Sequence, residues 1–188
     1  AEEYSVSVSV DYDSKVLGYQ ETTLESITDF EKNYADARTF CFLHELELLL
    51  KHGLIKGGDL SNAIVYVEKK VENKELERLA SIFKKENIGV NKDGYLNNLS
   101  LRYKDEAARH KLLDVIGDLT LIGMPIKGHI ITKKPGHKLN TSFAKILKKA
   151  MKEQENIDIL FYFKQKPPYD ITDIEKMLPH RYPFLLID

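Results

Sequence analysis

The stretch ARTFCFLHELELLLKHGLIKGGDLSNAIVYVE, residues 37–68, has the pattern that decides the fold class. Apolar residues over 38–43 predict a strand, and HELELLLKHG predicts a helix whose leucines share one face and which stops near Gly53. The Gly57-Gly58 turn then leads into a second predicted strand, NAIVYVE. A strand, a helix and a strand within about thirty residues predict a βαβ unit.

Strand and helix patterns continue on both sides of this unit. Alternating valines over Tyr4–Val10 predict a strand with one buried face, followed by a short helical or turn segment before residue 38. Residues 68–89 contain an amphipathic helix, which we interpret as a surface elaboration. The Asp93-Gly94 pair then predicts a hairpin turn.

The last third of the chain predicts two further helices. Asp105 is the expected N-cap of the first, which ends at Gly123 and Pro125. A strand and a Pro-Gly turn separate it from a basic helix, for which Asn140 or Thr141 is the expected cap.

The lysines of this basic helix, between Lys145 and Lys152, are expected to face solvent, and its buried side is expected to consist of Phe143, Ile146 and Leu147. Residues 156–166, NIDILFYFKQK, are interpreted as a last strand that ends at Pro167-Pro168 and completes a domain over residues 1–166. Residues 167–170, with two adjacent prolines, are expected to be a linker. Residues 171–188 then look like the start of a second domain.

Composition excludes several classes of protein. The 188 residues carry a formal net charge of -1, which gives no electrostatic footprint for nucleic acid. The one cysteine, Cys41, excludes an internal disulfide and a multi-cysteine zinc site. No apolar run reaches the roughly 18–20 residues of a membrane span. We therefore expect a soluble, cytoplasmic protein with no transmembrane segment and no nucleic-acid partner.

The stretch ARHKLLDVIGDL, residues 108–119, places four polar side chains on one helical face. His110, Asp114 and Asp118 are four residues apart, with Lys111 beside the histidine, and the leucines lie on the opposite side. A His/Asp pair at this spacing can close on one cation, because side chains four apart lie over one another. Most His/Asp pairs at this spacing are surface ion pairs, so spacing alone favours a solvated face and leaves the metal site as the alternative.

The remaining histidines are candidates of lower rank. His137 follows a Pro-Gly turn and precedes a helix, where a side chain can point into a cleft or simply be solvated. His129, in an apolar strand, is expected to be packed or hydrogen-bonded. His44, His52 and His180 receive no role.

Four segments together resemble one family. They are ARTFCF (37–42), GLIKGGDLSNAIV (53–65), LRYKDEAARHKLLDVIGDL (101–119) and GHIITKKPGHKLN (128–140). The chain resembles the second domain of the zinc-dependent UDP-3-O-acyl-N-acetylglucosamine deacetylases over residues 4–165. The resemblance implies an α+β fold, a two-layer sandwich of a mixed sheet packed on helices, with a βαβ insert at about 37–67.

The resemblance also implies a role for each polar residue. His110 and Asp114 would be two of the three protein ligands of a catalytic Zn²⁺. His137 would stabilise the oxyanion and protonate the leaving amine, and Asp118 would hold His137. Two further residues would act on the substrate: Thr39 as an oxyanion donor and Lys111 as a contact beside the metal.

The βαβ insert would form the passage for the substrate's acyl chain. The lining residues implied by the resemblance are Phe40, Phe42, Leu46, Ile55 and Val65. The basic helix after His137 would help to hold the UDP phosphates. The third zinc ligand and the general base are implied to lie in an N-terminal half of the same protein, so we expect the chain by itself to be inactive.

Residues 171–188 resemble the beginning of a hot-dog-fold 3-hydroxyacyl-(acyl-carrier-protein) dehydratase, for which acyl carrier protein would be the partner. Two alternatives to the deacetylase remain. One is a non-catalytic module of the same fold that binds an acyl chain or a nucleotide sugar. The other is a structural domain whose polar stripe is only a solvated face.

Overall fold

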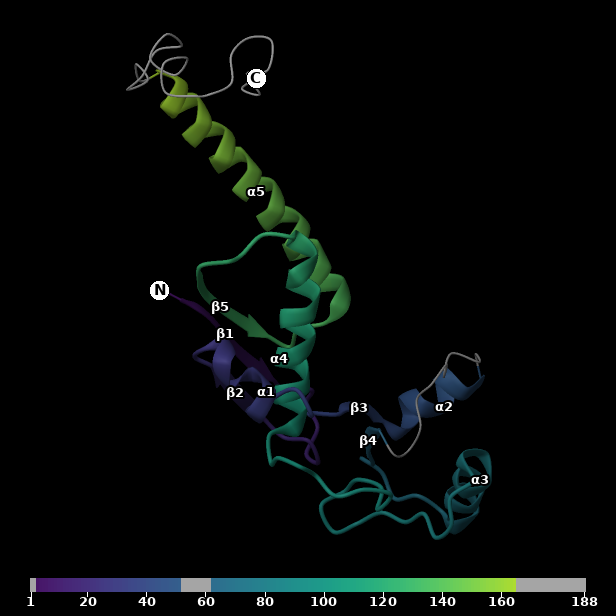
Figure 1. Ribbon diagram of the computed structural model, residues 1–188. Coiled ribbons are helices and arrows are strands. Elements are labelled where there is room, and N and C mark those ends of the chain that lie inside the picture. Colours follow the sequence, from purple (N-terminus) through teal and green to yellow (C-terminus); the bar gives the residue numbers. More distant parts are fainter. Residues whose placement is uncertain (1–2, 52–61, 165–188) are drawn as a thin grey trace, which may run out of the picture. The chain divides into compact units, whose positions relative to one another are not determined.

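A computed structural model describes residues 3–51 and 62–164, except for the side chains of Glu47 and of residues 49–51 and 155–164. The chain divides into two compact units, residues 1–144 and 145–188. Within the described part of the second unit there is a single element, the continuation of helix α5 (Figure 1). No helix among the described residues is long and apolar enough to cross a membrane.

The first unit is built on a three-stranded mixed sheet with the order β2-β1-β5. Strand β1 (Tyr4–Val10) pairs antiparallel with β2 (Gln20–Leu24) and parallel with β5 (Gly128–Lys133). The three valines of β1 are at most 1% exposed, and helix α4 (Glu106–Leu119) packs on β1 and β2. Because the alternating valines all point to one side, they give the sheet a single apolar face for the helix. The expected α+β arrangement is confirmed.

Strand β2 has no counterpart in the sequence prediction. Only Leu24 of its five residues is buried, so the apolar alternation that identifies β1 is missing. Its position comes from pairing with β1, in which Val6 lies opposite Leu24. The short helical segment that follows, η1 (Ile27–Asp29) with α1 (Phe30–Asn33), agrees with expectation.

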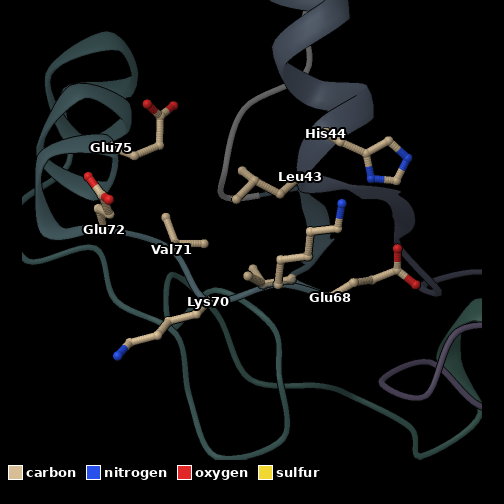
Figure 2. A pocket seen from close by; sticks show the side chains of 9 residues that line it. Leu43, His44, Glu68, Lys70, Val71, Glu72 and Glu75 are labelled. Carbon is tan, nitrogen blue, oxygen red and sulfur yellow. The ribbon is translucent and has the colours of Figure 1, made fainter.

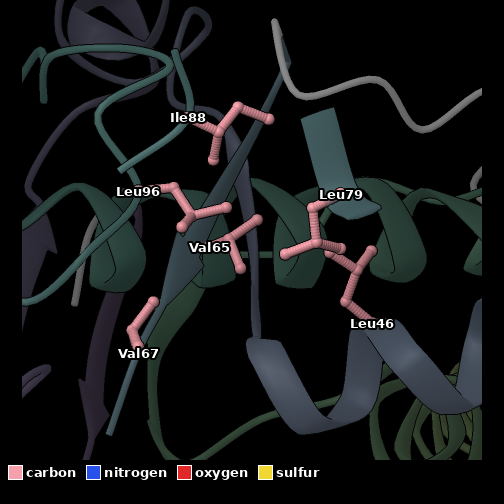
Figure 3. Close-up of a cluster of buried hydrophobic side chains, with 6 residues drawn as sticks. All are labelled: Leu46, Val65, Val67, Leu79, Ile88 and Leu96. Atoms are coloured by element: carbon pink, nitrogen blue, oxygen red, sulfur yellow. The ribbon is translucent and has the colours of Figure 1, made fainter. Parts of the chain in front are cut away.

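The insert is a βαβ unit, as predicted. Strands β3 (Thr39–Phe42) and β4 (Ala63–Tyr66) are parallel neighbours, and α2 (Leu43–Lys51) lies between them in sequence. One face of the two strands carries aromatic rings, with the Phe40 and Tyr66 ring centroids 6.0 Å apart. The other face carries Val65, which packs with Leu46 of α2 and Leu79 of α3 (Asn73–Phe83) in a buried cluster (Figure 3).

Residues 68–89 lie on the surface, in agreement with their interpretation as a surface elaboration, but the apolar side of their helix is part of the core of the insert. Leu79 of α3 is fully buried, and Ile88 and Leu96 belong to the same cluster. Two strands and one helix cannot bury an apolar face by themselves, and α3 completes that cover. The predicted Asp-Gly turn is confirmed, since Val90 and Leu96 form an antiparallel bridge across it and Gly94 has a φ of 80°.

Helix α4 begins where predicted, but its N-cap residue acts differently. The Asp105 carboxylate makes no capping hydrogen bond and instead accepts one from Arg109 Nε at 2.8 Å. The helix passes into a 3-10 turn, η2 (Thr120–Ile122), which ends at Gly123 with a φ of 76°. Left-handed backbone of this kind favours glycine, which explains the predicted stop.

Helix α5 (His137–Lys164) differs from expectation at both ends. It begins at His137, so neither Asn140 nor Thr141 is its cap; the Thr141 hydroxyl donates back to the His137 carbonyl, as interior hydroxyls do. The strand predicted over 156–166 is wrong for residues 156–164, because the helix continues to Lys164 and no glycine or proline interrupts residues 137–166. The linker and the segment from 171 to 188 lie outside the described residues.

The predicted buried side of this helix is also wrong. Phe143 is 42% exposed and Ile146 is 68% exposed, whereas Ala144 is buried. Leu147 is half-buried.

Candidate active site

The first turn of α4 is fastened to the start of β3 by a buried ion pair. Glu106 is 0% exposed, and its Oε1 accepts hydrogen bonds from Arg38 N at 3.1 Å and Arg38 Nε at 2.8 Å. Its Oε2 accepts from Arg38 Nη2 at 3.0 Å and from Arg102 N at 2.7 Å. Burial by itself raises the pKa of the Glu106 carboxyl, but these hydrogen bonds hold that pKa below its usual value. The Glu106 carboxylate is therefore ionised, and each of its oxygens accepts two hydrogen bonds.

One turn later, the His110 ring is oriented by a backbone carbonyl. Its Nδ1 lies 3.1 Å from the Ala37 oxygen, and because a carbonyl can only accept, Nδ1 carries the proton. Nε2 then has the free lone pair. It lies 3.5 Å from Asp114 Oδ1, so the two residues converge as an i, i+4 pair.

Asp114 is 8% exposed, and one hydrogen bond reaches its carboxylate from the residues that the structure describes. Its Oδ2 accepts one hydrogen bond, from Lys111 Nζ at 3.0 Å, and lies 4.0 Å from His137 Nε2. The Lys111 ammonium also lies over the Phe40 ring, 5.6 Å from the centroid. The helix therefore brings a carboxylate, a lysine and the edge of the insert together.

Asp118, one turn beyond Asp114, holds the start of α5. Its carboxylate lies 2.9 Å from His137 Nδ1, and its Oδ2 accepts a second hydrogen bond from Asn140 Nδ2, also at 2.9 Å. His137 itself is 70% exposed, so its Nε2 is accessible on the side of Asp114. Asn140 was expected to be a helix cap, but it is a hydrogen-bond donor to Asp118. Its spacing of three residues from His137 could have indicated this, because residues three apart on a helix lie on the same face.

The two other candidates from the insert's first strand are placed beside this cluster. Thr39 is exposed and follows directly after Arg38, the partner of Glu106. Phe40 packs edge-to-face with Tyr12, whose ring centroid is 5.7 Å away. Burial, and then the charges of Glu45 and Asp114, raise the pKa of Tyr12. Tyr12 was not identified from the sequence, where it stands two residues after the last of the alternating valines.

The residues expected to line an acyl passage fall into two groups. Phe40 and Phe42 lie on the aromatic face of the insert, and Phe42 is 6% exposed. Leu46 and Val65 lie inside the buried cluster of Figure 3 rather than along a cavity. Ile55 lies outside the described residues.

The insert also has a cavity of about 550 Å³ (Figure 2). Apolar side chains such as Leu43 and Val71 line it together with a charged rim that includes Glu68, Lys70 and Glu75. None of the polar site residues lines it. A separate cavity of about 520 Å³ is lined by His137 together with Lys134 and Lys138.

His129 is hydrogen-bonded, as expected, but it lies on the exposed face of the sheet. Its Nδ1 lies 2.7 Å from Ser5 Oγ and its Nε2 lies 2.9 Å from Ser7 Oγ. Both ring nitrogens are thus engaged by serines away from α4.

The donor set at the centre of α4 fits a zinc ion. Imidazole nitrogen and carboxylate oxygen are ligands that Zn²⁺ takes, and a ligating histidine ordinarily donates its other N–H to a carbonyl or carboxylate, as His110 does to Ala37. Over residues 3–51 and 62–164, no group of three or more such side chains is placed to hold a metal. Among the described residues, His110 and Asp114 therefore bring together two potential donor atoms, Nε2 and Oδ1, 3.5 Å apart.

Known proteins resemble this chain over most of its length. A sequence model of the family "UDP-3-O-acyl N-acetylglycosamine deacetylase" matches residues 1–83 and 80–149. The bifunctional enzyme LpxC/FabZ of Porphyromonas gingivalis is 45% identical over 187 residues, which cover 100% of this chain and 40% of that protein. The protein of the same name from Bacteroides thetaiotaomicron is 44% identical over 187 residues, covering 100% of this chain and 41% of its own length.

A relative named only for the deacetylase is similar over a shorter stretch. The UDP-3-O-acyl-N-acetylglucosamine deacetylase of Acidithiobacillus ferrooxidans is 35% identical over 175 residues, 92% of this chain and 49% of that protein. The chain thus spans less than half the length of these relatives. Since the family model matches well over half of its residues, the chain belongs to the UDP-3-O-acyl-N-acetylglucosamine deacetylase family.

Proposed function

We propose that this chain supplies one half of the active site of a deacetylase, and that an N-terminal half of the same protein supplies the rest. The reaction is hydrolysis of the N-acetyl amide of UDP-3-O-(3-hydroxyacyl)-N-acetylglucosamine, the committed step of lipid A synthesis. The observation that supports this most is the convergence of His137 Nε2 on Asp114, 4.0 Å away, beside His110. A proton carrier and two metal donors at one place suit amide hydrolysis.

His110 and Asp114 would hold a Zn²⁺ ion, with a third protein ligand from the N-terminal half. When bound, such an ion polarises the amide carbonyl and lowers the pKa of its water toward about 7. The orientation of His110 by the Ala37 carbonyl supports this role, because it leaves Nε2 free to ligate.

The chain's own residues would manage the oxyanion and the proton. Asp118 accepts from His137 Nδ1, which keeps the ring oriented and directs Nε2 toward the reacting amide. Protonated at Nε2, His137 would stabilise the oxyanion and then give its proton to the nitrogen as the C–N bond breaks. The Thr39 hydroxyl would donate a hydrogen bond to the same oxyanion, and Lys111 would contact substrate beside Asp114.

The rest of the substrate would extend to both sides of this centre. The aromatic face of the insert, with Phe40 and Phe42, would receive the acyl chain. Lys134 and Lys138, which line a cavity with His137, would face the diphosphate. Residues 171–188 would begin a fused 3-hydroxyacyl-(acyl-carrier-protein) dehydratase that takes acyl carrier protein as its partner. The bifunctional names of two relatives that match the whole chain support this.

Reconstitution tests this proposal. The 188-residue chain alone is expected to release no acetate from the substrate in the presence of Zn²⁺, and mixing it with the N-terminal half should restore hydrolysis. In the restored protein, His137→Ala should lower kcat by roughly 10²–10⁴-fold, the usual contribution of a proton-transfer residue. His129→Ala is the matched control, because its ring bonds only Ser5 and Ser7 among the contacts described, and it should leave kcat unchanged.

Two outcomes would contradict the proposal. Hydrolysis by the isolated chain would show that no second half is needed. A reconstituted protein that binds the substrate but never cleaves it would instead favour a non-catalytic binding module.

A further inference from the structure

The peptide group between Ala37 and Arg38 connects two side chains of α4. Its N–H donates to Glu106 Oε1 at 3.1 Å, and its carbonyl accepts from His110 Nδ1 at 3.1 Å. In a trans peptide the N–H and C=O groups point in opposite directions, whereas residues four apart on a helix lie on the same face. One peptide group therefore bridges Glu106 and His110 along the helix.

Glu106 holds this peptide group rigidly because the whole segment is fastened around it. Arg38 contributes two side-chain donors in addition to its N–H, and its Nη2 also donates to the Ser100 carbonyl. Arg102 N supplies the fourth hydrogen bond to the same carboxylate. Chains of hydrogen bonds polarise one another, so a buried anion at one end strengthens the carbonyl acceptor at the other.

We propose that Glu106 is a positioning residue for His110, acting through the Ala37–Arg38 peptide group: it fixes the Nδ1–H tautomer of the ring and leaves Nε2 as the free donor. The part of this inference that concerns metal rests on the proposed function, since it takes His110 Nε2 as a zinc ligand. The tautomer itself does not depend on any activity.

If the role of Glu106 were only structural, it would hold α4 to β3 without determining which tautomer the His110 ring adopts. The distinguishing measurement is the ring ¹⁵N chemical-shift pattern of His110 in the 188-residue chain at alkaline pH. The unmodified chain should show the Nδ1–H tautomer alone. Glu106→Gln should give a mixture of both tautomers, because the amide group removes the charge and turns an NH₂ toward N–H donors of Arg38 or Arg102.

Two control variants separate positioning from packing. Asp105→Asn removes the neighbouring ion pair with Arg109 but leaves the bridging peptide untouched, so the single tautomer should remain. Arg38→Lys removes the guanidinium fork but keeps the backbone N–H and the Glu106 charge, and it too should retain the single tautomer.

The second readout is Zn²⁺ affinity of the chain combined with the N-terminal half, measured by competition with a chelator. Glu106→Gln should weaken binding by roughly 10–100-fold relative to Asp105→Asn, the usual effect of losing a group that orients a ligand. If the reconstituted protein hydrolyses nothing, the proposed function fails while the tautomer result still decides this inference.

A folded Glu106→Gln chain that keeps one His110 tautomer would overturn the inference. If that variant does not fold, the double variant Arg38→Met/Glu106→Met removes both buried charges together, which proteins commonly tolerate. A single tautomer in the double variant overturns the inference as well. Failure of both variants to fold would assign Glu106 to folding alone.

Discussion

The first turn and the middle of α4 each hold a buried carboxylate, and the two differ in how they are satisfied. Glu106 accepts four hydrogen bonds from N–H donors at 2.7–3.1 Å. Asp114 accepts one, from Lys111, and faces His110 and His137 at 3.5 and 4.0 Å. A carboxylate has about four acceptor positions, so Glu106 is saturated, whereas the described residues leave acceptor positions of Asp114 open. Burial alone does not distinguish structural from functional carboxylates, whereas their partners do.

The largest expected effect is on stability at the first of these two sites. Glu106→Ala should lower the free energy of unfolding by about 3–5 kcal/mol, because it leaves the Arg38 guanidinium without its buried partner. Asp114→Asn should change it by less than about 1 kcal/mol, since Lys111 is partly exposed and can turn to water. Urea unfolding followed by circular dichroism measures both variants. Equal losses would remove the distinction between the two carboxylates.

A smaller effect on the free energy of unfolding is expected when the pH is lowered, and it too concerns Glu106. Since hydrogen bonds lower the pKa of Glu106 in the folded chain, its contribution to stability is complete above the unfolded value of about 4.3 and is lost as pH falls through the lowered native pKa. The free energy of unfolding should therefore fall more steeply between neutral and acid pH in the unmodified chain than in Glu106→Gln. If the free energy of unfolding fell equally with pH in the two proteins, Glu106 would have the same pKa in the folded and the unfolded chain.

The smallest expected effect concerns the carboxylate at the far end of the helix. Asn140→Ala removes one of the hydrogen bonds to Asp118 and should cost about 1 kcal/mol, the usual net value of such a bond. Ser142→Ala is the control and should be nearly neutral, because among the described residues its hydroxyl donates to the Lys138 carbonyl of its own helix. A loss at Ser142 as large as that at Asn140 would indicate a helix-propensity effect instead.

The site was predictable to the extent that it depends on helical spacing. His110, Asp114 and Asp118 lie on one face of α4 because the helix repeat puts residues four apart above one another. The approach of His137 to Asp118 depends on where α5 begins, and the expected cap at Asn140 or Thr141 placed that start four or five residues too late. Glu106 had the ordinary appearance of an acidic residue in a first helical turn, and nothing local distinguishes it from Glu75 of α3.

What the sequence determined by itself was local: the alternating valines of β1, the leucine face of α4, the βαβ unit and the polar stripe. Each of these follows from a repeat of two or of about 3.6 residues, which the backbone imposes without knowledge of distant partners. Only the tertiary structure decided that β2 pairs with β1, that α3 closes the core of the insert, and that one peptide group lies between Glu106 and His110. These arrangements join residues far apart in the chain, and such pairings depend on packing and on satisfying buried polar groups rather than on local periodicity.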